Sequence, residues 1–298
     1  MSQSIKNVMV MGAGGLFGTE LFAVLHKSND FNLSVLSRES SKSTFPSNVK
    51  VYKVDDDCPI LQLIEAFKGQ DALVSALPGR PYKVHLRMID AAIQAGVKRF
   101  IPSEFGNNTC AAAADLVPMY ADKAKVIAYL KEKESTGLTW TAIHGGQFFD
   151  WGLETGWLDF HVEEKAVTVY DSGDKLWSTT NIGTVATAVA KVLLKPEETK
   201  NKPMFISSFT VSQNQVLAEL ERATGKKWEV RRTTEEAALE KAKKLHEDHS
   251  DQLRLLVLML LYADSTDRGA NFEKDGLLSN ELLGLPVESL SDVIARIV

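Results

Sequence analysis

Two features of the sequence predict a doubly wound α/β fold, in which helices cover both faces of a parallel sheet. Short apolar runs rich in Val, Ile and Leu alternate with amphipathic segments through the first half of the chain, which is the pattern of parallel strands and crossover helices. A glycine-rich stretch, "GAGGLFG", stands at the first strand–helix junction. The parallel sheet should therefore form early in the chain, with these glycines at its carboxyl edge.

The apolar runs give the expected strands, and the amphipathic segments give the expected helices. The strands are expected at residues 7–12, 33–37, 49–54, 71–78, 99–103 and 138–146. The helices are expected at residues 18–28, 61–69, 82–96 and 119–134. Glycine follows two of these helices, in "KGQD" and "QAGVKR", as is usual where a helix ends.

The rhythm changes after about residue 150. Residues 159–179 indicate a hairpin, 181–195 a helix and 201–208 a further strand, and the rest of the chain is mostly helical and charged. We expect residues 1–155 to form the Rossmann domain, with elements around 176–210 returning to it. Residues 156–175 and 211–298 should form a smaller, mostly helical C-terminal substrate subdomain over the sheet's carboxyl edge.

Length and charge narrow the class of protein. The 298 residues are 44% hydrophobic and carry a net charge of −5, which favours a large packed core and argues against nucleic acid as a partner. Cys58 and Cys110 lack metal-type spacing and suit a reducing compartment. The apolar run at 253–264 is shorter than the roughly 20 residues of a membrane span, so it predicts a buried helix. We expect a cytoplasmic monomer or homodimer without a membrane partner.

The glycine-rich stretch predicts a dinucleotide site of the NAD(P)-binding Rossmann type. Glycines at this junction let the main chain turn tightly and approach a pyrophosphate at the N-terminus of the helix. At the end of the fourth strand, a second segment should lie near the nicotinamide ribose. The residues expected to contact the cofactor here are Gly12, Gly14, Gly15, Leu16, Phe17, Gly18, Ser75, Ala76 and Leu77.

The end of the second strand predicts which cofactor is bound. NAD-preferring proteins carry an acidic residue there, which binds the ribose 2′-hydroxyl. This chain has Arg38, with Ser37 beside it and Lys42 nearby, and an arginine fork matches a 2′-phosphate. We therefore expect NADP(H), the alternative being that Arg38 is a solvated surface residue.

The stretch "RFIPSEFG" ends the fifth strand at the same edge of the sheet. Phe105 can form a wall of the nicotinamide pocket, while Ser103 and Glu104 can hydrogen-bond the loop. For Glu104, a structural role in the loop is at least as well supported as a role as catalytic acid or base.

Several motifs together resemble the NmrA-like, isoflavone-reductase-like branch of the atypical short-chain dehydrogenases, and the fungal members above all. They are "GAGGLFG", Arg38, "RFIPSEFG", Lys123 on the following helix, and "TGLTWTAIHGGQFFDWGL". The resemblance implies NADPH as hydride donor and Lys123, beside the cofactor, as general acid/base, with Lys125 as the alternative. Tyr120 stands one residue too close to Lys123 for the usual Tyr-x-x-x-Lys pair.

The segment after the sixth strand is expected to contact the substrate. Its aromatic residues suit a flat apolar ligand, and the expected contacts are His144, Gln147, Phe148, Phe149 and Trp151. No metal is expected, because His246 and His249 imply no third ligand. The function predicted is reduction of an aromatic or conjugated small molecule by NADPH. The alternative is an NADP(H)-binding redox sensor that regulates a protein partner without turnover.

Overall fold

The computed structural model describes residues 4–77, 81–109, 113–245, 250–265 and 267–298. Its centre is a parallel sheet of seven strands in the order β11-β6-β5-β4-β1-β2-β3. The strands are β1 (Asn7–Met11), β2 (Asn32–Arg38), β3 (Lys50–Val54), β4 (Ala72–Ser75), β5 (Arg99–Ile101), β6 (Thr139–His144) and β11 (Lys202–Phe205). The predicted doubly wound Rossmann fold is confirmed.

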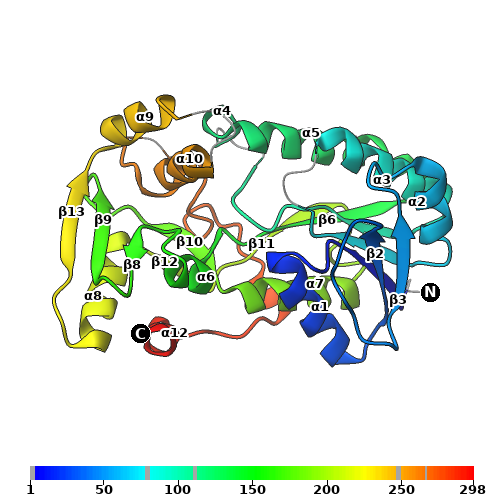
Figure 1. The fold of residues 1–298 in the computed structure, drawn as a ribbon, viewed down its shortest axis with the longest axis horizontal. Coiled ribbons are helices and arrows are strands. Elements are labelled where there is room, and N and C mark those ends of the chain that lie inside the picture. Colours follow the sequence, from blue (N-terminus) through cyan, green and yellow to red (C-terminus); the bar gives the residue numbers. More distant parts are fainter. Residues whose placement is uncertain (1–3, 78–80, 110–112, 246–249, 266) are drawn as a thin grey trace.

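Helices cover both faces of this sheet, and in Figure 1 the two layers lie on its opposite sides. One layer contains α1 (Leu16–Ser28) and α7 (Ile182–Leu194), and the other contains α2 (Ile60–Phe67), α3 (Tyr82–Gln94) and α5 (Pro118–Glu132). Side chains alternate along β1, so that Val8 and Val10 pack against the first layer while Met9 and Met11 pack against the second. Burial on both faces explains the continuous apolar runs of the sequence.

The C-terminal part adds two three-stranded sheets, with strand orders β12-β10-β7 and β13-β9-β8. Their strands are β7 (Gln147–Phe148), β8 (Phe160–His161), β9 (Ala166–Tyr170), β10 (Trp177–Thr180), β12 (Phe209–Val211) and β13 (Glu229–Thr233). The hairpin expected at 159–179 is formed by β8 and β9. Strand β13 departs from the mostly helical expectation, because its side chains are largely exposed and charged and so lack an apolar pattern.

Further helices, most of them in the C-terminal part, complete the fold. They are α4 (Ala113–Leu116), η1 (Glu134–Thr136), α6 (Phe149–Glu154), α8 (Gln213–Thr224), α9 (Glu235–Lys243), α10 (Ser250–Tyr262), α11 (Asn280–Leu283) and α12 (Leu290–Ile297). The apolar helix α10 is buried in a second core with residues of β9, α6 and α8. Within the described ranges, no helix has the length and apolar character needed to cross a membrane.

The first turn of α1 packs directly on the glycine-rich loop. A methyl group at Gly18 would lie 1.9 Å from the main-chain oxygen of Gly12 and 2.8 Å from its carbonyl carbon. In α7, a methyl group at Gly183 would meet only the carboxylate end of Glu20, at 3.4 Å. These two helical glycines therefore differ in the space around them.

Gly18→Ala should destabilise the protein by roughly 1–3 kcal/mol, because main-chain atoms must move to admit the methyl group. Gly183→Ala is the matched control, and it should stabilise the protein by up to about 1 kcal/mol, since alanine is the better helix former. Urea unfolding of both variants measures the difference. Equal midpoints for Gly18→Ala and the parent protein would contradict the close packing.

Candidate active site

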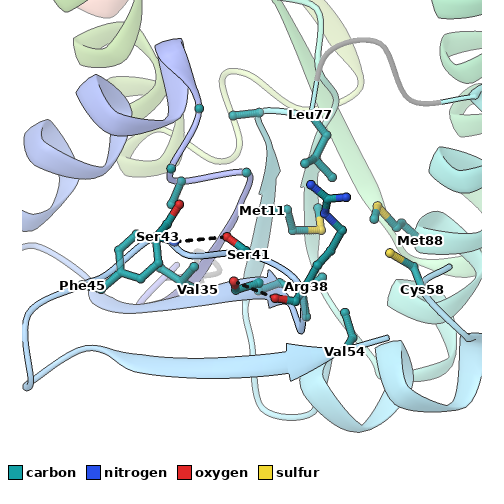
Figure 2. Close-up of a pocket in the computed structure, with 17 residues that line it drawn as sticks. Met11, Val35, Arg38, Ser41, Ser43, Phe45, Val54, Cys58, Leu77 and Met88 are labelled. Atoms are coloured by element: carbon teal, nitrogen blue, oxygen red, sulfur yellow. Dashed lines mark hydrogen bonds between the residues drawn. The ribbon is translucent and has the colours of Figure 1, made fainter. Parts of the chain in front are cut away.

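A pocket of about 300 Å³ opens at the carboxyl ends of β1, β2 and β4 (Figure 2). Its floor is apolar, and the glycine loop and the turn after β2 form its rims. It is lined by Met11, Gly12, Ala13, Gly14, Gly15, Val35, Leu36, Ser37, Arg38, Ser41, Ser43, Phe45, Val54, Cys58, Ala76, Leu77 and Met88. This is the place where open α/β sheets bind ligands.

The glycine loop presents main chain, and not side chains, to this pocket. Gly12 has a φ of +82°, and a methyl group there would lie 2.4 Å from the main-chain oxygen of Ala76. Gly15 is the N-cap of α1, and it has no side chain to accept a hydrogen bond from the first N–H groups of the helix. Such N–H groups can bind an anion.

Arg38 ends β2 and extends its guanidinium into the pocket, on the side of Leu77 (Figure 2). Its side chain is 46% exposed, and its Nη1 lies 3.6 Å from a carboxylate oxygen of Asp56, which is 50% exposed. Sequence analysis placed Arg38 where NAD-preferring proteins carry an acidic residue, but it did not identify Asp56 as a neighbour of this arginine. Pairing of β2 with β3 brings the turn that carries Asp56 beside Arg38, and an exposed ion pair of this kind is weak.

Lys53 of β3 holds the turn that follows Arg38. Its Nζ donates to the main-chain oxygens of Arg38, at 2.9 Å, and Ser41, at 3.2 Å, and to Oγ of Ser37, at 3.4 Å. Ser41 and Ser43 line the pocket next to Arg38. Lys53 thus positions a polar rim that sequence analysis did not identify.

A second cavity, of about 410 Å³, lies beside the first and shares Leu77 with it. It is enclosed by α3, the loop after β5, and α5. Its lining is Leu77, Pro81, Tyr82, His85, Pro102, Ser103, Glu104, Met119, Asp122, Lys123 and Val126.

Lys123 points into this cavity, whereas Lys125 does not. The Nζ of Lys123 donates a hydrogen bond of 2.8 Å to the main-chain oxygen of Glu104. Lys125 is exposed, pairs with Asp122 at 2.8 Å, and lies 4.7 Å from the ring centre of Tyr82. Residues two apart on a helix do not share a face, and of these two lysines Lys123 is the one that lines the cavity.

Burial lowers the pKa of Lys123, and the negative charge of Glu104 partly opposes this change. Tyr120, one turn earlier on α5, is buried, and burial raises its pKa to about 12. Its hydroxyl accepts a hydrogen bond from Nδ2 of Asn107. Burial therefore makes the proton of Lys123 easier to release and the proton of Tyr120 harder to release.

The predicted cofactor residues fall into two groups. Gly12, Gly14, Gly15, Ser37, Arg38, Ala76 and Leu77 line the first pocket. The other predicted residues do not line it. Leu16 and Lys42 are exposed, Gly18 packs on Gly12, Ser75 is completely buried, Phe17 and Phe105 pack together in the core, and Lys123 lines the second cavity described above.

Phe105, which was expected in the wall of the nicotinamide pocket, lines neither of the two cavities. Its ring is buried against that of Phe17, with ring centres 4.4 Å apart, and both belong to the core between the sheet, α1 and α7. The hydrophobic gain of this contact explains why the two rings lie in this core and not in a cavity wall.

None of the residues expected to contact substrate lines the cavity of Lys123. His144 is completely buried, with its ring stacked on that of Phe205, and Phe149 is buried edge-on against Phe209. Phe148 stacks on Phe17. The side chain of Gln147 accepts a hydrogen bond from Trp157, which packs beside Trp151.

Apolar burial is the physical reason for these placements, because an aromatic side chain suits a core as well as a ligand wall. The cavity uses Tyr82, His85 and Met119 in their place. Tyr82 and His85 are spaced i and i+3 at the start of the helix after β4, which puts them on one face at the carboxyl edge. This spacing is the sequence feature from which Tyr82 and His85 could have been identified as lining residues. Cys110, His246 and His249 lie outside the described residues.

Comparison with known proteins places the chain in one family. The model of the NmrA-like family matches residues 4–260. Oxidoreductase aprR from Aspergillus flavus is 38% identical over 295 residues, which cover 97% of this chain and 98% of that protein.

Two solved structures are similar over nearly the whole chain, at a low level of sequence identity. A crystal structure of isoflavone reductase is 18% identical, with a TM-score of 0.79, and the match covers 99% of this chain and 100% of that one. A structure of AtPrR2 with NADP⁺ and (+)pinoresinol is 18% identical, with a TM-score of 0.80, and covers all of both chains.

Lys53→Met should loosen residues 38–43, because it removes two hydrogen bonds to this turn, at Arg38 and Ser41, and one to Ser37 just before it. Amide hydrogen exchange in the turn should become about three- to tenfold faster, since these bonds are partly solvent-exposed. Lys50→Met is the matched control on the same strand, as the Lys50 ammonium lies over the ring of Tyr52 and away from this turn. Unchanged amide exchange in Lys53→Met would show that the turn is stable without these hydrogen bonds.

Proposed function

Because the chain belongs to the NmrA-like family, we propose that this oxidoreductase is an NADPH-dependent reductase of an aromatic or conjugated small molecule, with Lys123 as general acid/base. The single observation that supports this most is the shared wall at Leu77. It puts a pocket built for a dinucleotide next to a cavity that contains a half-buried lysine.

The first pocket fits NADPH. Gly12 and Gly14 leave space where a side chain would collide with Ala76 or Ser43, so a pyrophosphate can approach the main chain and the first turn of α1. Ser37, Arg38, Ser41 and Ser43 would hold the 2′-phosphate, and Val35, Val54, Cys58 and Met88 offer an apolar bed for the adenine. The known complex of AtPrR2 with NADP⁺ supports the same choice of cofactor.

Bound NADPH would supply the hydride, and the protein would manage the accompanying proton. The substrate accepts two electrons with the hydride, and the Lys123 ammonium gives a proton to the atom on which negative charge develops. Lys123 then regains a proton from water. Its hydrogen bond to the main-chain oxygen of Glu104 fixes the ammonium within the cavity, and its lowered pKa makes the proton easier to release.

The cavity's lining supports an aromatic substrate. Pro81, Pro102, Met119, Val126 and Leu77 provide apolar contacts, and Tyr82 and His85 provide rings that carry polar atoms. Among the described lining residues, Lys123 is the one Lys or Arg side chain. A molecule with one reducible polar group on an apolar frame fits this arrangement better than a polyanion does.

Arg38 should make NADPH bind more tightly than NADH by about 1.5–3 kcal/mol, because the guanidinium can hold a 2′-phosphate through charge-assisted hydrogen bonds. Arg38→Glu should abolish this preference. Asp56→Asn is the control, since it removes the carboxylate beside Arg38 and keeps the guanidinium, so the preference should persist or grow. Fluorescence titration with both cofactors measures it, and equal affinities in the parent protein would refute the assignment.

Lys123→Ala should lower reduction by roughly 10²–10⁴-fold, the usual contribution of a positioned acid/base, while NADPH affinity changes little. The measurement is NADPH oxidation with a panel of phenolic and quinone-like compounds. Lys125→Ala should keep parental turnover, as Lys125 lies outside the cavity lining. If no compound is reduced while NADPH binds tightly, a redox sensor is the better description.

A further inference from the structure

Glu104 is tied to Lys123 in two ways. Its main-chain oxygen accepts the 2.8 Å hydrogen bond from the Lys123 ammonium. Its carboxylate also acts on that ammonium electrostatically, against the effect of burial. One residue therefore influences both the position and the charge of the amine.

The Glu104 side chain is built into the protein interior. The residue is only 3% exposed, and Oε2 of its carboxylate accepts a hydrogen bond of 2.7 Å from the hydroxyl of Thr109. The Nδ1 atom of His144 lies 3.9 Å from the same oxygen. A carboxylate buried to this extent is costly unless a positive charge compensates it.

His144 does not provide that positive charge at neutral pH. Burial lowers its pKa, so the ring is neutral there. Its Nδ1 lies 3.1 Å from the main-chain oxygen of Asn107, which can only accept, so Nδ1 carries the hydrogen of the neutral ring. His144 thus supports the loop through its hydrogen bond to Asn107. The negative charge of Glu104 must be compensated by another group.

The other titratable groups around the cavity do not provide this positive charge, which points to Lys123. Tyr120 stays protonated, because burial raises its pKa to about 12. Asp122 faces the cavity but is paired with Lys125 at 2.8 Å. Tyr82 and His85 face the cavity from α3. Among these described groups, Lys123 is the lysine that lines the cavity, and its ammonium lies 2.8 Å from the main-chain oxygen of the residue that carries the buried carboxylate.

We propose that Glu104 is a positioning residue for the reduction: its buried carboxylate is the counter-charge that keeps Lys123 an ammonium inside the cavity, and its main-chain oxygen directs that ammonium. The proposal rests on the function proposed above for Lys123. Without the carboxylate, burial acts unopposed and Lys123 gives up its proton at a lower pH. The lysine is then a neutral amine under conditions in which the substrate needs a proton.

Glu104→Gln tests the counter-charge directly, because glutamine keeps the main-chain oxygen and can still accept the Thr109 hydrogen bond. The readout is acetylation of Lys123 by trace acetic anhydride across neutral to alkaline pH, followed by mass spectrometry. Only the free amine reacts. The midpoint should fall by about one pH unit, which makes Lys123 about tenfold more reactive below the midpoint. Asp122→Asn is the matched control and should leave the midpoint unchanged.

An unchanged midpoint in Glu104→Gln, or an equal shift in Asp122→Asn, would overturn the proposal. This labelling uses neither cofactor nor substrate, so it tests Glu104 even if the reductase assay fails. Conversely, the expected fall of the midpoint in Glu104→Gln together with full turnover in Lys123→Ala would overturn the proposed function and leave the electrostatic role of Glu104 supported.

A second measurement applies if Glu104→Gln folds poorly. Loss of one charge leaves the other buried without compensation, so the double variant Glu104→Gln/Lys123→Met should be more stable than Glu104→Gln alone. In urea unfolding, the second change should recover at least about tenfold in the unfolding equilibrium constant. If the two changes destabilise the protein additively, the charges are not coupled and the proposal fails.

Discussion

The close approach of three main-chain segments at Gly12, Gly18 and Ala76 determines where both cavities lie. The end of β1 meets the segment after β4 through a 2.8 Å hydrogen bond from the Ala76 N–H to the Met11 oxygen. The first turn of α1 rests on Gly12 at a distance that excludes a side chain at Gly18. Leu77 follows Ala76 and lines both cavities. Packing at the glycine loop therefore sets how a dinucleotide would face the cavity of Lys123.

Two pairs of opposite charge stand at this edge of the sheet, and their burial gives them different physical roles. Arg38 and Asp56 are each about half exposed, so water screens their attraction, and a phosphate could replace the carboxylate at little cost. Glu104 is almost fully buried, so removal of Lys123, its proposed counter-charge, would leave an uncompensated charge in a medium of low dielectric. The first pair suits exchange with a ligand, and the second suits a permanent arrangement.

The sequence predicts the large sheet well because each of its strands has a local signature. Burial on both faces requires continuous apolar runs, and the glycine loop needs residues without side chains, so both are visible in the residue order. The different directions of Lys123 and Lys125 follow from helical geometry alone. The proximity of Asp56 to Arg38 depends on the register of β2 and β3, which no local pattern encodes. The lining of the Lys123 cavity was not visible in the sequence for a related reason: Phe149 and Tyr82 are both aromatic, and only tertiary packing decides which of them lines that cavity.

The stretch "SEFG" combines these effects in four residues. Phe105 adopts a φ of +43°, a conformation that costs energy for a bulky residue, and its ring is buried against Phe17. Phe17 also stacks on Phe148, so the loop is anchored to α1 and to the segment after β6 at once. This apolar contact offsets the backbone strain and fixes the peptide that follows Glu104, whose oxygen is the one that Lys123 meets. Burial of the Phe105 ring therefore fixes the direction of the Glu104 main-chain oxygen, while the Glu104 carboxylate provides the charge.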